Sequence, residues 1–217
     1  MNDSACDAAA MNAALVNAAF ALGAQKGWRH VSVPAAARHA GLDLVQARMA
    51  FPSTGAILRA FGRMADAAAL TGSLNDGSVR DNLFDSLLRR FDFLQAHRAG
   101  VIALLKFLPA CPPLALLLLE LNLSSMGWLL EGAGVDATGL RGAARKRGLL
   151  LVWAYGMRAW LRDESADLSA TMAAVDTALA RAESFALRYA PAAPAPAPSP
   201  APDEPEAPSP ETVPPVE

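Results

Sequence analysis

Residues Val31 to Phe51 read VSVPAAARHAGLDLVQARMAF, and this stretch indicates the fold of the whole chain. Ser32 is suited to cap a first short helix. Gly41 provides the left-handed residue that ends this helix, and Asp43 then caps a second helix from about Leu44 to Ala50. Two helices joined by a short glycine turn form a helix-turn-helix, whose second helix can enter a DNA major groove. The alternative is an ordinary helical corner inside an all-α core.

The composition changes sharply towards the end of the 217-residue chain. Residues 190–217 hold eleven of the sixteen prolines and five acidic residues, with no basic or aromatic residue. Such a segment buries too little apolar surface to offset the entropy lost on ordering, so we expect a disordered tail. In residues 1–189, alanine and leucine dominate and β-branched residues are sparse, which is typical of an all-α protein.

The formal net charge of −2 is unevenly distributed. Residues 1–65 carry six Lys or Arg residues against three acidic residues, whereas residues 66–189 carry thirteen of each. The tail adds five acidic residues. A basic segment at residues 1–65, followed by a neutral segment, is suited to bind a polyanionic partner through residues 1–65.

The sequence holds no signature of an enzyme, a cofactor site or a metal site. Its two cysteines and three histidines show no metal-ligand spacing, and no glycine-rich phosphate loop is present. The acidic cluster of Asp163, Glu164 and Asp167 is expected to have a solvated capping role at a helix junction. The acidic start is unlike a signal peptide, and we interpret the apolar run Leu114–Leu130 as a buried core helix, since it contains Glu120. We therefore expect a cytoplasmic protein without a catalytic role and without contact to a membrane.

Hydrophobic periodicity predicts further helices on both sides of the helix-turn-helix. The expected ranges are 7–25 and 54–70 around it, then 78–97, 100–108, 112–132 and 137–162. A last helix carries Leu168, Met172, Val175, Leu179, Ala182, Ala186 and Tyr189, whose steps of four and three residues form a strict a/d seam. This seam, beside the mostly apolar run Leu149–Trp160, fits a dimer built as a four-helix bundle.

The segment from Leu15 to Ala65 resembles the DNA-binding domain of the TetR family of transcriptional regulators. The matching motifs are Ala18–Ala19, Lys26-Gly27-Trp28, Ser32-Val33, Ala37 to Gly41, and Phe51-Pro52-Ser53. The resemblance implies a DNA-binding domain over residues 1–65 and an effector-binding and dimerisation domain over residues 66–189, followed by the tail.

Several positions depart from the family's pattern. Arg48, Met49 and Ala50 stand where the family usually has an aromatic pair and a His or Tyr, and Thr54 replaces the usual Lys after Pro-Ser. Arg48 is able to replace a phosphate contact or to read a guanine edge. The expected DNA-binding residues are Ser32, Pro34, Leu44, Val45, Gln46, Arg48 and Thr54.

The family also implies a ligand cavity and a dimer. Aromatic and methionine side chains typically line apolar pockets, although they fill ordinary cores as well. The expected effector-pocket residues are Phe107, Met126, Trp128, Trp153 and Met157. The expected dimer-interface residues, on one of the two helices that form the interface in the family, are Leu168, Met172, Val175, Leu179, Ala182 and Ala186.

Two functions compete at this point. The first is a homodimeric regulator that binds a palindromic double-stranded DNA operator and leaves it when a small apolar or aromatic effector binds. The second is a protein of the same fold without DNA binding, which carries a lipid or isoprenoid as the accessory proteins of ubiquinone biosynthesis do. A lipid carrier needs an exposed apolar helix to meet a membrane. The polar tail supplies none, which favours the regulator.

Overall fold

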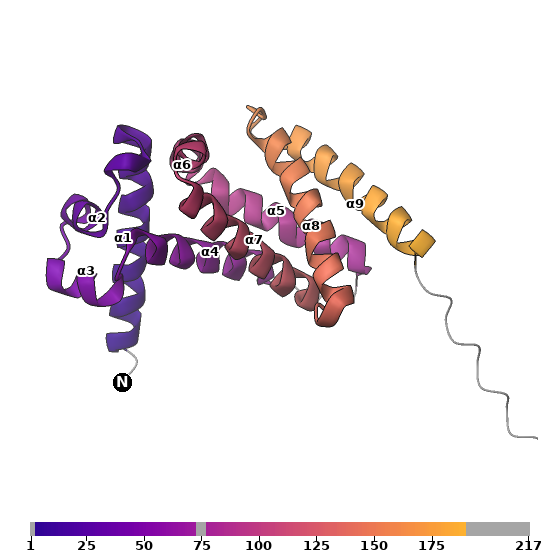
Figure 1. The fold of residues 1–217 in the computed structure, drawn as a ribbon, viewed down its shortest axis with the longest axis horizontal. Coiled ribbons are helices and arrows are strands. Elements are labelled where there is room, and N and C mark those ends of the chain that lie inside the picture. The colour runs from indigo at the N-terminus through magenta and orange to yellow at the C-terminus, as the bar shows by residue number, and fades with distance from the viewer. Residues whose placement is uncertain (1–2, 73–76, 190–217) are drawn as a thin grey trace, which may run out of the picture.

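The computed structural model describes residues 3–72 and 77–189. Within these ranges the chain folds into α-helices and two short 3-10 turns without a strand, which confirms the expected all-α fold (Figure 1). The tail that we expect to be disordered, residues 190–217, lies outside the described residues. The elements are α1 (Asp3–Lys26), η1 (Trp28–His30), α2 (Val33–Ala40), α3 (Leu44–Ala50), α4 (Thr54–Leu70), α5 (Val79–Gln95), α6 (Arg98–Phe107), η2 (Leu108–Ala110), α7 (Pro112–Gly132), α8 (Gly139–Trp160) and α9 (Ser169–Tyr189).

Helices α1, α2 and α3 form a small head at one end of the molecule (Figure 1). Small side chains let these helices approach closely, since Ala36, Ala37 and Ala47 are at most 1% exposed. Gly27, with a φ of 83°, lies directly after α1 and turns the chain into η1. Trp28 in η1 is buried against the head. The head is therefore held by alanine packing and one large aromatic anchor.

Helix α4 leaves the head and continues into the body, so the domain boundary expected at residue 65 falls inside this helix (Figure 1). The side chain of Ser53 caps α4 by accepting a hydrogen bond from the backbone N–H of Ala56 at 3.3 Å. The buried face of α4 packs on α1 of the head and on α5 and α7 of the body. A displacement of α4 in the body would therefore be transmitted directly to the head.

The head and the body also meet where α1 packs against α6. Phe20 of α1 stacks on Phe61 of α4 with ring centroids 3.8 Å apart, and the ring of His97 packs edge-on to both. A Cβ added to Gly100 would lie 2.6 Å from the backbone oxygen of Phe20. Glycine at this position therefore permits the close contact between α6 and α1.

Helices α5, α7, α8 and α9 form the rest of the body. Gly156 lets α8 approach both α9 and α5, because an added Cβ would lie 2.8 Å from Val175 and 3.0 Å from Phe91. Phe91 stacks on Trp153 at 4.4 Å between ring centroids, which fixes α5 against α8. Arg80 of α5 forms an ion pair with Asp176 of α9 at 2.6 Å.

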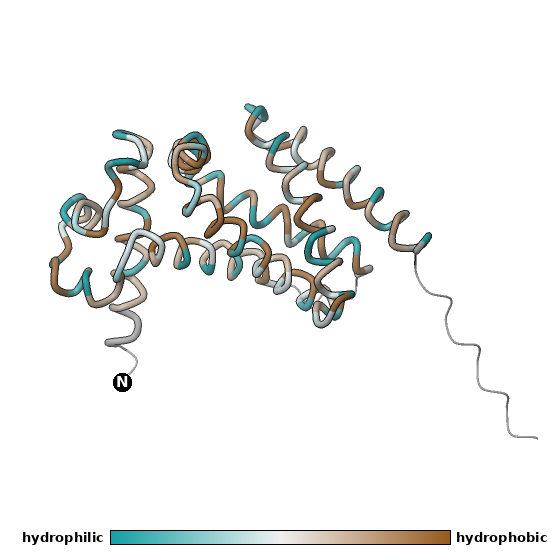
Figure 2. Tube along the Cα trace, in the orientation of Figure 1, coloured by the Kyte–Doolittle hydropathy of each residue, from teal (hydrophilic) through white to brown (hydrophobic). Residues whose placement is uncertain are grey.

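Helix α7 is only half-buried, which corrects the expectation of a buried core helix over Leu114–Leu130. Its inner face holds Met126, Leu129 and Leu130, but Leu116 is 67% exposed and Trp128 is 61% exposed. Figure 2 shows the hydrophobic residues along this helix. In the described ranges, Pro112–Gly132 and Asp7–Lys26 are long and apolar enough to span a membrane by length and composition, and both take part in the packing of this fold.

Asp163 organises the turn between α8 and α9. Its carboxylate accepts hydrogen bonds from the hydroxyl of Ser165, from the hydroxyl of Thr171 at 2.7 Å and from the backbone N–H of Thr171 at 2.8 Å. These bonds, first among them the one from Ser165, hold the pKa of Asp163 well below its usual range although burial opposes the shift. Asp163 therefore caps the helix junction as expected, but from a buried position, since it is 5% exposed, which corrects the expectation of solvated capping.

Candidate nucleic-acid interface and ligand cavity

Local hydrogen bonds build the helix-turn-helix from the residues that the sequence singles out. Ser32 caps α2 by accepting from the backbone N–H of Ala35 at 3.3 Å, and Gly41 follows α2 in the left-handed region with a φ of 67°. The carboxylate of Asp43 then accepts from the backbone N–H groups of Val45 and Gln46, both at 2.9 Å. Helix α3 begins and ends at the predicted residues because both of its boundaries are set by short-range chemistry.

A groove of about 460 Å³ lies between α3 and the first turns of α2 and α4. It brings together five of the expected DNA-binding residues, whereas Val45 and Gln46 are not part of its wall. The first turn of a helix presents backbone N–H groups and the positive end of the helix dipole, which suit an anion. The residues of the wall are Ser32, Val33, Pro34, Leu44, Ala47, Arg48, Phe51, Pro52, Ser53 and Thr54.

Helix α3 presents nearly all of its side chains to solvent. Ala47 is its buried residue, whereas Val45 is 71% exposed and Met49 is 82% exposed. Gln46 is also exposed and carries an amide that is able to pair with a base edge. Exposed apolar side chains on a short helix suit contact with thymine methyl groups in a major groove.

Arg48 lies at the end of α3, where the chain turns into α4. Its Nη1 donates a hydrogen bond to the backbone oxygen of Pro52 at 2.8 Å. This bond uses one of five guanidinium N–H donors and holds the cation at the wall of the groove. The position beside the first turn of α4 is better suited to a phosphate than to a base edge.

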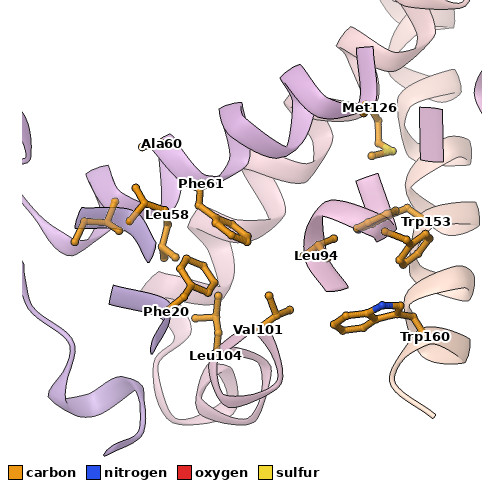
Figure 3. Close-up of a cluster of buried hydrophobic side chains, with 14 of the residues drawn as sticks. Phe20, Leu58, Ala60, Phe61, Leu94, Val101, Leu104, Met126, Trp153 and Trp160 are labelled. Atoms are coloured by element: carbon orange, nitrogen blue, oxygen red, sulfur yellow. The ribbon is translucent and has the colours of Figure 1, made fainter. Parts of the chain in front are cut away.

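A cavity of about 140 Å³ lies in the body among α4, α5, α6, α7 and α8. Figure 3 shows the side chains of Phe61, Leu94, Val101 and Trp153 in this region. Most of the wall is apolar, and Arg90 and Asn122 contribute a guanidinium and an amide. The wall consists of Leu58, Phe61, Gly62, Ala65, Arg90, Leu94, Val101, Leu104, Leu105, Leu118, Leu121, Asn122, Trp153 and Met157.

The structure brings together two of the five expected effector-pocket residues. Trp153 and Met157 line the cavity, whereas Met126 is fully buried in the core and Phe107 is half-buried outside the wall. Trp128 points away from the core, which corrects its assignment to the pocket. Trp128 is 61% exposed and lies two turns beyond Leu121, outside the wall of this cavity.

The expected dimer seam on α9 is largely used within the protomer. Leu168, Val175 and Leu179 are at most 5% exposed, Met172 and Ala182 are half-buried, and Ala186 is exposed. Helices α8 and α5 of the same chain cover the buried members. Leu168, Val175 and Leu179 therefore pack inside the subunit, which corrects the expectation that these three residues face a second copy.

Sequence reasoning missed Arg90 as a residue of the cavity wall. Arg90 is 5% exposed, and its Nη1 donates to the Oδ1 of Asp66 in α4. Burial lowers the pKa of Arg90, and the charge and hydrogen bond of Asp66 oppose this shift. The spacing of residues could have indicated that Arg90 is buried, since it continues the helical spacing of the core residues Leu83 and Leu87 on α5.

Among the residues that the structure describes, no group of three or more His, Cys, Asp or Glu side chains lies close enough to hold a metal ion. The wall of the cavity and the wall of the groove also lack a carboxylate pair or a nucleophile with a base.

No family model and no curated protein matches the sequence. Solved structures do match the fold. A TetR transcriptional regulator from Nitrosomonas europaea ATCC 19718 is 18% identical with a TM-score of 0.63, over 80% of this chain and 98% of that chain. A TetR transcriptional regulator from Rhodococcus sp. RHA1 is 15% identical with a TM-score of 0.55, over 81% of this chain and 96% of that chain.

A third match extends the comparison to another organism. A TetR-family transcriptional regulator from Streptomyces coelicolor is 16% identical with a TM-score of 0.54, over 82% of this chain and 85% of that chain. These alignments include the body as well as the head, because each covers more than three quarters of the chain. The chain therefore has the fold of the TetR-family transcriptional regulators.

Proposed function

We propose that the protein is a DNA-binding transcriptional regulator of the TetR type. The observation that carries this proposal is the groove in the head, where α3 stands exposed between two capped helix N-termini and Arg48. This arrangement offers apolar and amide groups to bases and N–H groups to phosphates. The likeness in fold to TetR regulators over 80% and 81% of the chain supports the same function.

We propose a homodimer in which the outer faces of α8 and α9 meet a second copy. On α8, Leu151 is 72% exposed and Tyr155 is 45% exposed. On α9, the hydroxyls of Thr177 and Ser184 donate to backbone oxygens of their own helix at 2.8 and 2.9 Å. With these hydroxyls satisfied, the outer face of α9 presents small side chains on which another helix can pack closely.

The test of DNA binding starts with the purified full-length chain and sheared genomic DNA of its source organism. Recovered fragments are titrated by fluorescence anisotropy at low salt. We expect a two-fold symmetric site with half-sites about 34–36 Å apart, since the symmetry of a dimer is matched by its operator. Val45→Glu places a negative charge on the exposed face of α3 and should abolish binding.

The control is Leu116→Glu, which makes the same kind of change at a 67% exposed position on α7. Equal affinity of the wild type and the Val45→Glu variant for every fragment would exclude α3 as the recognition helix. In a repressor, a small apolar effector that enters the body cavity would lower the affinity for the operator.

A lipid carrier is the second candidate, because α7 exposes Leu116, Leu119 and Trp128. Such a face is able to lie at a membrane surface. The cavity of about 140 Å³ is nevertheless far too small for a polyprenyl chain, which favours the regulator. Flotation of the protein with anionic phospholipid vesicles, lost in the Leu116→Glu variant, would instead support the carrier.

A further inference from the structure

The outward face of α3 carries two large apolar side chains. Val45 and Met49 are both largely exposed, whereas Ala47 of the same helix is buried against the head. The two residues are four positions apart, so their side chains lie on one face of the helix, one turn from each other. The packing of the head does not account for them, since neither is buried in it.

Few polar groups of α3 are placed to read a base edge. The carboxylate of Asp43 accepts from two backbone N–H groups at the start of the helix, both at 2.9 Å. Arg48 lies at the wall of the groove, where its Nη1 donates to a backbone oxygen at 2.8 Å. Gln46 is exposed beside Val45 and carries an amide. The contact face of α3 therefore offers two apolar side chains and one amide.

The major groove of DNA presents one apolar group, the C5-methyl of thymine. The other groups on its base edges are donors and acceptors, which an apolar side chain leaves without a partner. Four residues advance a helix axis by about 6 Å and one base-pair step advances the duplex by about 3.4 Å, so Val45 and Met49 match methyl groups about two base pairs apart. An amide such as that of Gln46 pairs with adenine, whose partner is thymine.

We propose that α3 selects its operator by thymine methyl groups, with Val45 and Met49 each in contact with one methyl and the amide of Gln46 on an adenine. This inference rests on the proposed function as a DNA-binding regulator and names the base pairs that the regulator reads. Contacts of Arg48 and of the capped helix starts with phosphates position α3 but carry no sequence information. Each half-site therefore has A·T pairs at the positions that these three side chains contact.

Deoxyuridine tests the methyl contacts, because it differs from thymidine only by the absence of the C5-methyl group. The full-length wild type selects its operator from a randomised duplex library, and each thymine is then replaced by deoxyuridine in both half-sites. Fluorescence anisotropy should show two thymine positions at which the replacement lowers the affinity about tenfold, since each lost methyl contact costs about fourfold and the site has two halves. Replacement of the other thymines should leave the affinity unchanged.

The variants Val45→Ala and Met49→Ala assign each methyl group to a side chain. Each variant should bind the operator more weakly, lose the effect of deoxyuridine at one of the two positions and keep the effect at the other. Both changes introduce alanine at an exposed helical position, so the head should still fold, which circular dichroism checks. Leu116→Ala, the matched control, shortens an exposed apolar side chain on α7 and should keep both effects.

The outcomes separate this inference from the proposed function. Specific binding of a selected operator by the wild type without any effect of deoxyuridine would overturn the methyl readout and leave the proposed function intact. Retention of both effects in both alanine variants would overturn the roles of Val45 and Met49. Selection of no sequence by the wild type would overturn the proposed function, and the methyl readout with it.

Discussion

Trp28 donates its indole N–H to the backbone oxygen of Gly100 at 2.8 Å, and this buried bond joins the head to the body across 72 residues. It lies beside the contact of α6 with Phe20, where an added Cβ would not fit. The head is thus attached by α4 along the chain and by η1 and α6 through space. Two connections make the orientation of the head depend on the packing of the body.

The first prediction concerns this bond. Trp28→Phe removes this indole donor and part of a buried ring, and we expect a loss of about 1–3 kcal/mol in the free energy of unfolding. Urea titration followed by circular dichroism measures the loss. Trp128→Phe is the matched control, because Trp128 is 61% exposed and should change the free energy of unfolding little. Equal effects of the two substitutions would contradict the assignment.

The second prediction compares two glycines in helices. Gly100→Ala forces a Cβ to 2.6 Å from the backbone oxygen of Phe20 and should separate α6 from α1. Gly148→Ala in α8 meets no atom within 4 Å and should stabilise the protein by up to about 1 kcal/mol through helix propensity. Thermal unfolding should show shifts of opposite sign, and shifts of the same sign would disprove the close contact of α6 with α1.

The third prediction is a pH dependence due to Asp163. Hydrogen bonds hold its pKa in the folded protein below the value of about 3.9 in an unfolded chain. The folded state therefore binds fewer protons, and the stabilisation is present above about pH 4 and decreases as the pH falls. The free-energy difference between wild type and Asp163→Asn should shrink between about pH 6 and about pH 3, whereas the exposed control Glu164→Gln should show no such trend.

The fourth prediction separates the dimer interface from the protomer core. Leu151→Glu changes an exposed residue of α8 and should give a folded monomer by multi-angle light scattering and circular dichroism. Val175→Asp buries a charge in a fully buried position and should unfold the protein. A wild-type monomer at roughly micromolar concentration, or a dimeric Leu151→Glu variant, would rule out the proposed interface on α8.

The head could be predicted from the sequence because its structure is set by short-range chemistry. Ser32, Gly41 and Asp43 each act on atoms at most five residues away, so their roles are visible in the order of residues. The partner of the α9 seam could not be predicted in this way. A strict a/d spacing shows that Val175 is buried, but not whether α8 of the same chain or a second copy buries it.

Which of two tryptophans lines the cavity could likewise not be predicted from the sequence. Trp128 and Trp153 both belong to apolar helices, yet one is 61% exposed and the other is 5% exposed. Helix α7 has hydrophobic residues on most of its circumference, so the sequence alone does not fix which face points inwards. Arg90 could have been found, since a charged residue in a core register needs a buried partner or a function.

The last prediction concerns Arg48 and the proposed operator. Its bond to the oxygen of Pro52 holds the guanidinium at the wall of the groove, beside the capped start of α4. From this position we expect a phosphate contact. Arg48→Ala should then weaken binding evenly across DNA sequences, and the slope of log affinity against log salt should fall by about one.

Fluorescence anisotropy titrations of the recovered operator and of a scrambled duplex, each over a range of salt concentrations, measure both quantities. Arg147→Ala is the matched control, because Arg147 is an exposed cation of α8 whose Nη1 also donates to a backbone oxygen, that of Ala143 at 3.3 Å. This control should leave the affinity and the salt slope unchanged. A loss confined to the operator, with an unchanged salt slope, would show instead that Arg48 reads a base, because a base contact discriminates between sequences and releases no counterion.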